Sequence, residues 1–179
     1  MNYQVDFWGV LDPSMLVFLL PLAFIPWLLK ATAQWKEYRW LIPVGIPLLI
    51  LFFLVAPLSQ VGSGWRLSDG KLRLEAGPVS TLDVSAMRVA LVESSSSWRP
   101  VMRTNGYGTS RLSTGWYRLA NGREAVVFRH LRSEKMVVIE AGGRYYIISH
   151  PGVEKLYAAL IARGAAQWAA DAREGKGGG

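Results

Sequence analysis

Cysteine is absent from this 179-residue chain, and only two histidines are present. The lack of thiols excludes disulfide bonds and thiolate chemistry. His130 and His150 have no carboxylate cluster beside them, whereas a metal site needs three or four converging ligands. No serine stands in a Gly-x-Ser-x-Gly motif, which is the pattern of one large class of nucleophilic serines. The sequence therefore predicts a protein that is not an enzyme and that holds no metal and no cofactor.

Charge is missing from two stretches near the start of the chain. Residues 13–29 and 40–59 contain no Asp, Glu, Lys or Arg, and both are strongly apolar. At about 1.5 Å per residue, helices of this length match the hydrocarbon core of a bilayer, which is about 30 Å thick. We therefore expect a membrane protein in which residues 1–60 form a two-helix transmembrane hairpin, with spans at about 13–30 and 40–59.

Two other structures could explain the apolar runs. A pair of buried core helices is disfavoured, because no later segment offers matching faces to enclose helices that are hydrophobic all round. A cleavable signal peptide would find a small-x-small site at residues 31–33. However, the N-terminus carries no Lys or Arg, and the apolar run is longer than that of a usual signal peptide.

Charges and tryptophans beside the two spans predict an orientation. Lys30, Lys36 and Arg39 lie in the connector 30–39, and positive charge is retained in the cytoplasm. The connector is therefore expected to be cytoplasmic and both termini outside, although basic residues also follow the second span closely. The residues expected at the membrane interface are Trp8, Trp27, Trp35, Trp40, Trp65, Arg66, Lys71 and Arg73.

The pattern of the chain changes to that of short strands from Trp65 onward. Residues 68–70 (Ser-Asp-Gly), 121–122 (Asn-Gly) and 142–143 (Gly-Gly) mark tight hairpin turns between apolar runs. Residues 81–87 are typical of a turn capped near Thr81 or Asp83. About seven antiparallel strands are expected in all.

A helix is expected to follow the last strand. Pro151 suits its first position, with His150 as the capping residue. Val153, Leu156, Leu160 and Ile161 then fall on one apolar face. Gly164 can end the helix. Residues 61–164 are thus expected to form one domain, and residues 165–179 a tail that is partly helical and then disordered.

The order of strands and helix resembles a known family. Residues 103–108 (Arg-Thr-Asn-Gly-Tyr-Gly), 115–119 (Gly-Trp-Tyr-Arg-Leu), 137–139 and 146–149, with the terminal helix, are similar to the bacterial pleckstrin-homology (PH)-like domains that follow a transmembrane hairpin. This resemblance implies a mainly β, PH-like barrel with a C-terminal α-helix. It implies no activity, because one fold serves unrelated ligands.

A long segment rich in Ser, Gly and Arg, residues 94–114, is expected to be a loop. Structureless loops of this length are uncommon in compact domains and are often functional. Exposed Trp, Tyr and Arg are enriched at interface hot spots, so we expect truncation in this loop to weaken partner binding and to leave folding nearly unchanged. The expected partner-binding residues are Trp98, Arg99, Arg103, Tyr107 and Arg111.

These features favour a non-enzymatic scaffold or accessory subunit. It would be a multi-pass protein of the bacterial inner membrane, with its PH-like domain outside the cytoplasm, docked on subunits of a larger membrane protein complex. The alternative is a stand-alone protein that binds anionic lipid surfaces or senses envelope stress. The net charge of +7 suits non-specific contact with anionic head groups. Nucleic acid is not expected, because the arginines are scattered rather than clustered on one helix.

Overall fold

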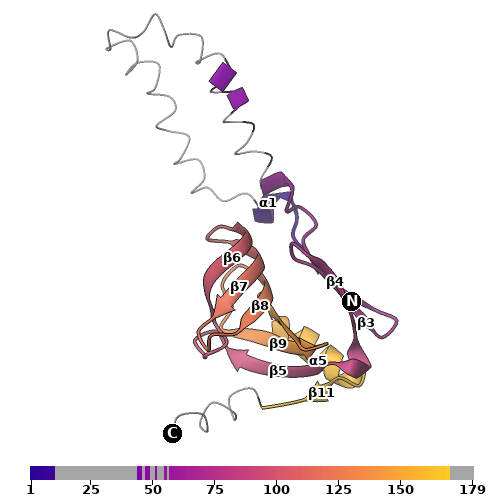
Figure 1. Ribbon diagram of the computed structural model, residues 1–179. Coiled ribbons are helices and arrows are strands. Elements are labelled where there is room, and N and C mark those ends of the chain that lie inside the picture. The colour runs from indigo at the N-terminus through magenta and orange to yellow at the C-terminus, as the bar shows by residue number, and fades with distance from the viewer. Residues whose placement is uncertain (11–43, 46, 49–50, 52–54, 56, 170–179) are drawn as a thin grey trace, which may run out of the picture. The chain divides into compact units, whose positions relative to one another are not determined.

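Two β-sheets and one helix account for most of the described chain. The computed structural model describes residues 1–10, 44–45, 47–48, 51, 55 and 57–169. The chain divides into two compact units, of which one joins Met1–Val5 to Gly62–Gly179 and the other is Asp6–Val61. The first unit carries every described strand (Figure 1). The second unit includes the short helix α1 (Phe7–Val10).

The smaller sheet has four antiparallel strands in the order β1-β2-β3-β4. The predicted turn between β2 and β3 is confirmed: Asp69 and Gly70 have φ of 50° and 69°, as a two-residue hairpin turn requires. β1 was not predicted, since a three-residue strand leaves almost no pattern. The strands are β1 (Asn2–Gln4), β2 (Gly64–Ser68), β3 (Lys71–Glu75) and β4 (Val79–Asp83).

A short 3-10 turn, Val84–Ala86, connects β4 to the larger sheet. Of the two capping residues that the sequence predicts, Thr81 and Asp83, it is Asp83 that caps this turn: its carboxylate accepts hydrogen bonds from the hydroxyl and the backbone N–H of Ser85. These two bonds lower the pKa of the Asp83 carboxyl below its usual value.

The larger sheet has seven strands in the order β11-β5-β9-β10-β8-β7-β6. The expectation that all strands are antiparallel is wrong at two places, because β10 runs parallel to β8 and β11 runs parallel to β5. β10 folds back on β9 and enters the sheet between β9 and β8, which sets its direction along β8. The strands are β5 (Arg88–Glu93), β6 (Pro100–Gly108), β7 (Leu112–Leu119), β8 (Glu124–His130), β9 (Lys135–Ala141), β10 (Arg144–Ser149) and β11 (Ala166–Gln167).

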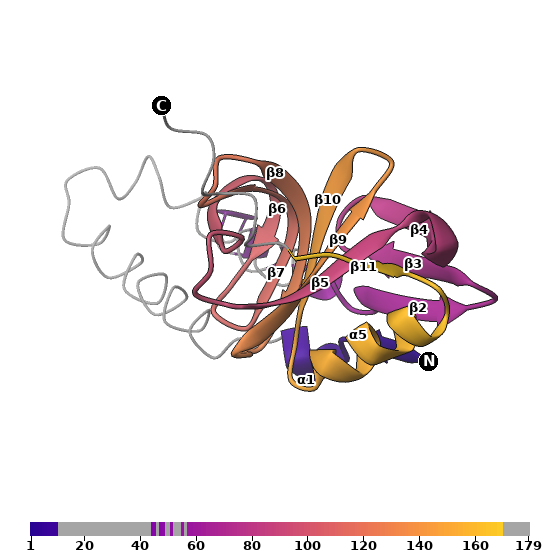
Figure 2. The same cartoon turned by 90° about the horizontal axis from the view of Figure 1, so that it is seen from below.

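Helix α5 (Val153–Ala162) lies against β5 and β9 (Figure 2). Its Val153, Leu156 and Leu160 are buried, which confirms the predicted apolar face. The helix begins later than expected, because Gly152 with φ of 78° takes the capping position. The predicted helical extension past Gly164 is wrong up to residue 169, since residues 166–167 form β11 instead.

The buried face of α5 and the strands that it contacts, β5 and β9, form one hydrophobic core. A second hydrophobic core lies among strands β5 and β7–β10. Alternate residues of neighbouring strands share one face of a sheet, and here that face brings together apolar side chains of five strands. The core residues are Ala90, Val92, Trp98, Tyr117, Leu119, Ala125, Val127, Met136, Val138 and Ile147. One end of this core meets the surface at the pocket described below.

The predicted fold class needs correction. Among the described residues no helix is long and apolar enough to cross a membrane, so the prediction of a membrane protein with a transmembrane hairpin is wrong for that part of the chain. The span at 13–30 and the connector 30–39 fall outside the described residues, and of the span at 40–59 only residues 44–45, 47–48, 51, 55 and 57–59 are described. What the structure supports is a mainly β fold. The PH-like assignment stays a prediction.

Candidate functional site

An acid-free segment carries much of the positive charge of the first unit. No Asp or Glu occurs between Glu93 and Glu124, whereas five arginines do. The expectation of a long loop at 94–114 is wrong, because residues 100–108 form strand β6 and residues 112–114 begin strand β7, which pairs with it. The arginines are Arg99, Arg103, Arg111, Arg118 and Arg123.

β6 is an edge strand of the larger sheet, and most of its residues are exposed to solvent. Residues 101–106 are exposed without alternation, so neither face of the strand is covered by the described residues. Val101 and Met102 retain 53% and 49% of their accessible surface. The pairing with β7 shifts register between Pro100 and Met102 and again between Arg103 and Asn105. Such bulges are a common feature of edge strands.

The structure separates the predicted partner-binding residues. Trp98 is 1% exposed and belongs to the second core, so the expectation of an exposed tryptophan is wrong. Arg99, Arg103 and Arg111 are exposed, and Tyr107 is half-buried. Arg103 lies opposite Tyr117, and its guanidinium is 3.4 Å from the carbonyl oxygen of Gly108.

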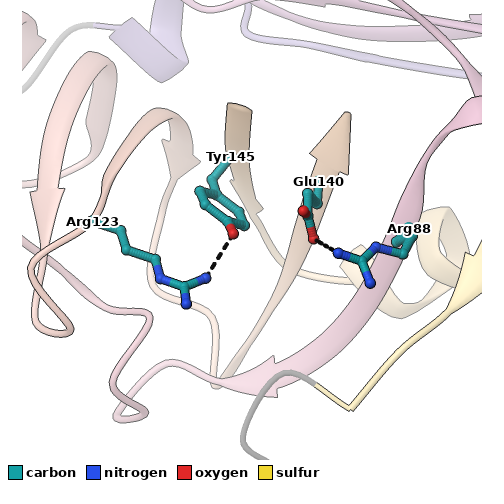
Figure 3. A network of polar contacts seen from close by, with 4 residues as sticks. All are labelled: Arg88, Arg123, Glu140 and Tyr145. Carbon is teal, nitrogen blue, oxygen red and sulfur yellow. Dashed lines mark hydrogen bonds and ion pairs between the residues drawn. The ribbon is translucent and has the colours of Figure 1, made fainter. Parts of the chain in front are cut away.

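Trp98 is held by aromatic rings and guanidinium groups at one end of the second core. Its ring centroid is 5.1 Å from Tyr145 and 5.4 Å from Trp168, and the Arg123 guanidinium lies 5.2 Å from it. Arg123 donates a hydrogen bond to the Tyr145 hydroxyl, and Arg88 pairs with Glu140 (Figure 3). These two arginines therefore have partners within the fold.

A pocket of about 960 Å³ opens at the surface of the same core. Three arginines line it: Arg99 directly precedes β6, and Arg129 and Arg132 lie on the last part of β8 and just after it. The buried side chains of Val127 and Ile147 contribute to its lining. None of the three arginines forms an ion pair with a carboxylate of the described chain. The pocket is therefore strongly positive.

Serine hydroxyl groups fix the backbone around this pocket. The hydroxyls of Ser94 and Ser149 donate to the carbonyl oxygens of Ser133 and Lys135, and Ser133 also donates to Lys135. Leu131 has φ of 61°, a conformation that is unfavourable for a branched side chain. Its N–H donates to the carbonyl oxygen of Arg111 over 2.6 Å. The segment that carries Arg132 is thus held in a strained, defined conformation.

Sequence reasoning missed Arg129 and Arg132. The signal available was two arginines at the end of a predicted strand, followed by a short polar loop. Nothing in that pattern places Arg129 and Arg132 beside Arg99, which lies 30 and 33 residues earlier in the chain. The curvature of the sheet brings the three together.

Of the residues predicted at a membrane interface, Trp65 is 2% exposed and Trp8 is 73% exposed. The burial of Trp65 contradicts its predicted interfacial position, since its ring packs against Tyr3 and His150. Arg66, Lys71 and Arg73 are exposed on β2 and β3, and Arg73 pairs with Glu75. Trp27, Trp35 and Trp40 lie outside the described residues.

Both histidines belong to an aromatic cluster where the two sheets meet. Trp65 donates its indole N–H to His150 Nε2 over 3.0 Å, and Tyr3 stacks on the His150 ring at 3.9 Å. The Tyr3 hydroxyl is 2.6 Å from His130 Nδ1. His150 Nδ1 lies 2.9 Å from the Pro151 carbonyl oxygen. This bonding requires a neutral His150 with its proton on Nδ1.

Acidification should weaken the fold through His150. Burial lowers the pKa of His150, although the bond to Pro151 acts in the opposite direction and His130 and Glu154 exert smaller effects. The unfolded chain then binds a proton more readily than the folded chain, so the stabilisation is complete above about pH 6.5 and is lost as the pH falls below it. We expect the melting temperature to fall between pH 8 and pH 5, and to fall less in His150→Gln. Equal pH dependence in the two proteins would contradict this assignment.

The described residues contain no group of three or more His, Asp or Glu side chains placed to hold a metal ion. Comparison with protein-family models, with curated proteins and with solved structures returned no match for this chain.

Proposed function

We propose that this protein is a non-enzymatic docking module that binds an acidic, extended segment of a partner protein along β6. In that role it is a scaffold or accessory subunit of a larger assembly. The observation that carries the proposal is the combination of an exposed edge strand with an arginine-rich segment that contains no acid from residue 94 to residue 123.

The edge position supports a partner that adds a strand. Edge strands offer main-chain donors and acceptors on one side, and extended peptides bind them by continuing the sheet. At nine residues, β6 is longer than most strands. The pairing on its other side, with β7, is already made. A partner strand would therefore pair with the free edge of β6.

The charge supports an acidic partner. Arg103 and Arg118 are exposed on β6 and β7, and Arg118 lies opposite Met102 while Arg103 lies opposite Tyr117. Directly opposed residues share a face of the sheet, so the two arginines point to opposite faces. A carboxylate on either face of a partner strand would therefore meet an arginine, which is Arg103 on one face and Arg118, beside Met102, on the other.

The test measures binding of the purified full chain to a synthetic peptide of alternating Glu and Val or Thr. We expect binding that weakens about tenfold (about 1.4 kcal/mol) in Arg103→Glu or Arg118→Glu. Arg144→Glu, which reverses an exposed charge on the β9–β10 hairpin, serves as the matched control and should bind as the unaltered chain does. Hydrogen exchange of the β6 amides should slow when the peptide binds.

Other outcomes would overturn the proposal. If a peptide with Lys in place of Glu binds equally well, recognition does not depend on the negative charge of the partner. The chain could instead fail to bind the acidic peptide and bind phosphatidylglycerol vesicles, with a similar loss of vesicle binding for each exposed arginine that is replaced. In that case its function is contact with anionic lipid.

A further inference from the structure

The pocket beside β6 has a chemistry of its own. Only Arg99 of its three arginines adjoins β6, whereas Arg129 and Arg132 lie at the end of β8 and just after it. We infer that this pocket is a binding site for a small phosphate monoester with an apolar body. The inference goes beyond the proposed docking function and does not rest on it.

The charge of the pocket selects a dianion. Arg99, Arg129 and Arg132 face a pocket with Glu134 as its one acidic lining residue, which leaves an excess of two positive charges. A phosphate monoester carries close to two negative charges near neutral pH and presents three acceptor oxygens. A monocarboxylate offers one charge and two oxygens. Planar guanidinium groups bind phosphate oxygens in pairs, so the monoester is the better match.

The donors are available for a ligand. Arg99 and Arg132 make no hydrogen bond or ion pair with other described side chains. Arg129 donates one N–H to the hydroxyl oxygen of Ser113, at 3.2 Å, and a guanidinium has five N–H donors in all. The hydroxyls of Ser94, Ser133 and Ser149 already donate to carbonyl oxygens. The arginines therefore have N–H groups available for an anion.

The volume of the pocket and its apolar lining indicate a ligand larger than a free phosphate ion. A cavity of about 960 Å³ is at the upper end of the range for small-molecule sites. Val127, Met136 and Ile147 lie at its base and belong to the second core. An apolar group attached to the phosphate would cover these side chains while the phosphate faces the arginines. The ligand class is thus an aryl or alkyl phosphate.

Rigidity of the pocket rim is consistent with a preformed site. Leu131 keeps its positive φ of 61° next to Arg132, and only one other non-glycine residue of the described chain, Asp69 in a hairpin turn, has a positive φ. Strain of this kind persists where surrounding contacts impose it, and it is concentrated at ligand sites. A preformed site avoids the entropy cost of ordering its side chains on binding.

Calorimetric titration of the full chain at constant ionic strength tests the inference, with phenyl phosphate, inorganic phosphate and phenol as probes. Phenyl phosphate should bind at least tenfold more tightly than inorganic phosphate, and phenol should not bind. Arg132→Gln and Arg99→Gln should each weaken phenyl phosphate at least tenfold. Arg144→Gln, whose side chain is exposed elsewhere, should bind as the unaltered chain does.

The outcomes separate this site from general attraction of anions and from peptide docking. The inference is overturned if phenyl phosphate does not bind at concentrations up to about 10 mM. It is also overturned if Arg132→Gln binds phenyl phosphate as tightly as the unaltered chain, or if Arg144→Gln weakens binding as much as Arg132→Gln does. Vesicles that contain phosphatidic acid distinguish the sources of phosphate: binding to vesicles but not to phenyl phosphate would overturn the small-ligand assignment. Arg132→Gln should still bind the acidic peptide, so the two proposals can fail separately.

Discussion

Replacing Gly115 with alanine is expected to lower the free energy of unfolding by about 2–6 kcal/mol. Gly115 on β7 faces Gly106 on β6, and a Cβ atom on Gly115 would lie 2.7 Å from the Gly106 Cα and closer still to the carbonyl oxygen of Asn105. The contacted atoms are backbone, so no side chain can turn aside. The φ of Gly115 is also positive, at 116°, where other residues are strained.

Gly122→Ala is the matched control for this prediction. Gly122 has a similar positive φ, 81°, but a Cβ atom there would meet nothing within 4 Å. It therefore carries the backbone strain without the clash, and it should cost about 1–3 kcal/mol. Thermal and urea unfolding of the two variants measure the difference. If Gly115→Ala costs no more than Gly122→Ala, the close approach of β6 and β7 is not present in solution.

Local signals in the sequence predicted the parts of the fold that local forces determine. The turns at Asp69-Gly70 and Asn121-Gly122 need positive φ, and only a few residue types supply it. The buried face of α5 follows from the spacing of Val153, Leu156 and Leu160. Each of these features depends on residues that are close together in the chain.

The features that sequence reasoning missed depend on distant partners. β6 looked like a loop because its glycines and polar residues lack an alternating pattern, and the close Gly106–Gly115 approach that allows the pairing is visible only in three dimensions. β11 is two residues long and exists because β5 offers it an edge. The pocket likewise joins Arg99 to Arg132 across the curve of the sheet. The spacing of residues in the sequence does not predict contacts between such distant segments.

Trp98 shows how the same residue can be assigned the opposite role. A tryptophan between serines and arginines is typical of an exposed hot spot, and the sequence gives no sign that Trp168 covers it from the far end of the domain. In the structure Trp98 belongs to a core, so its removal should affect folding first. This reverses the expectation that truncation leaves the fold unchanged.

Trp98→Ala is therefore expected to cost about 3–5 kcal/mol of folding stability, as the removal of large buried aromatic side chains does. The ring is 1% exposed and contacts Tyr145, Trp168 and the Arg123 guanidinium. All three contacts would lose their partner, and the cavity would lie next to the segment that carries β11. Total stability of a domain is about 5–15 kcal/mol, so the melting temperature should fall by about 10 °C or more.

Met102→Ala provides the comparison, because Met102 lies on the neighbouring strand β6 and is 49% exposed. Its truncation should change stability by no more than about 0.5 kcal/mol. Trp168→Ala should reproduce part of the Trp98→Ala loss, since the two rings share a contact at 5.4 Å, and the double variant should lose less than the sum of the two. A Trp98→Ala protein that melts within about 2 °C of the unaltered chain would show that Trp98 is exposed in solution. In that case the tryptophan would again be a candidate for partner contact, and its place in the core would be wrong.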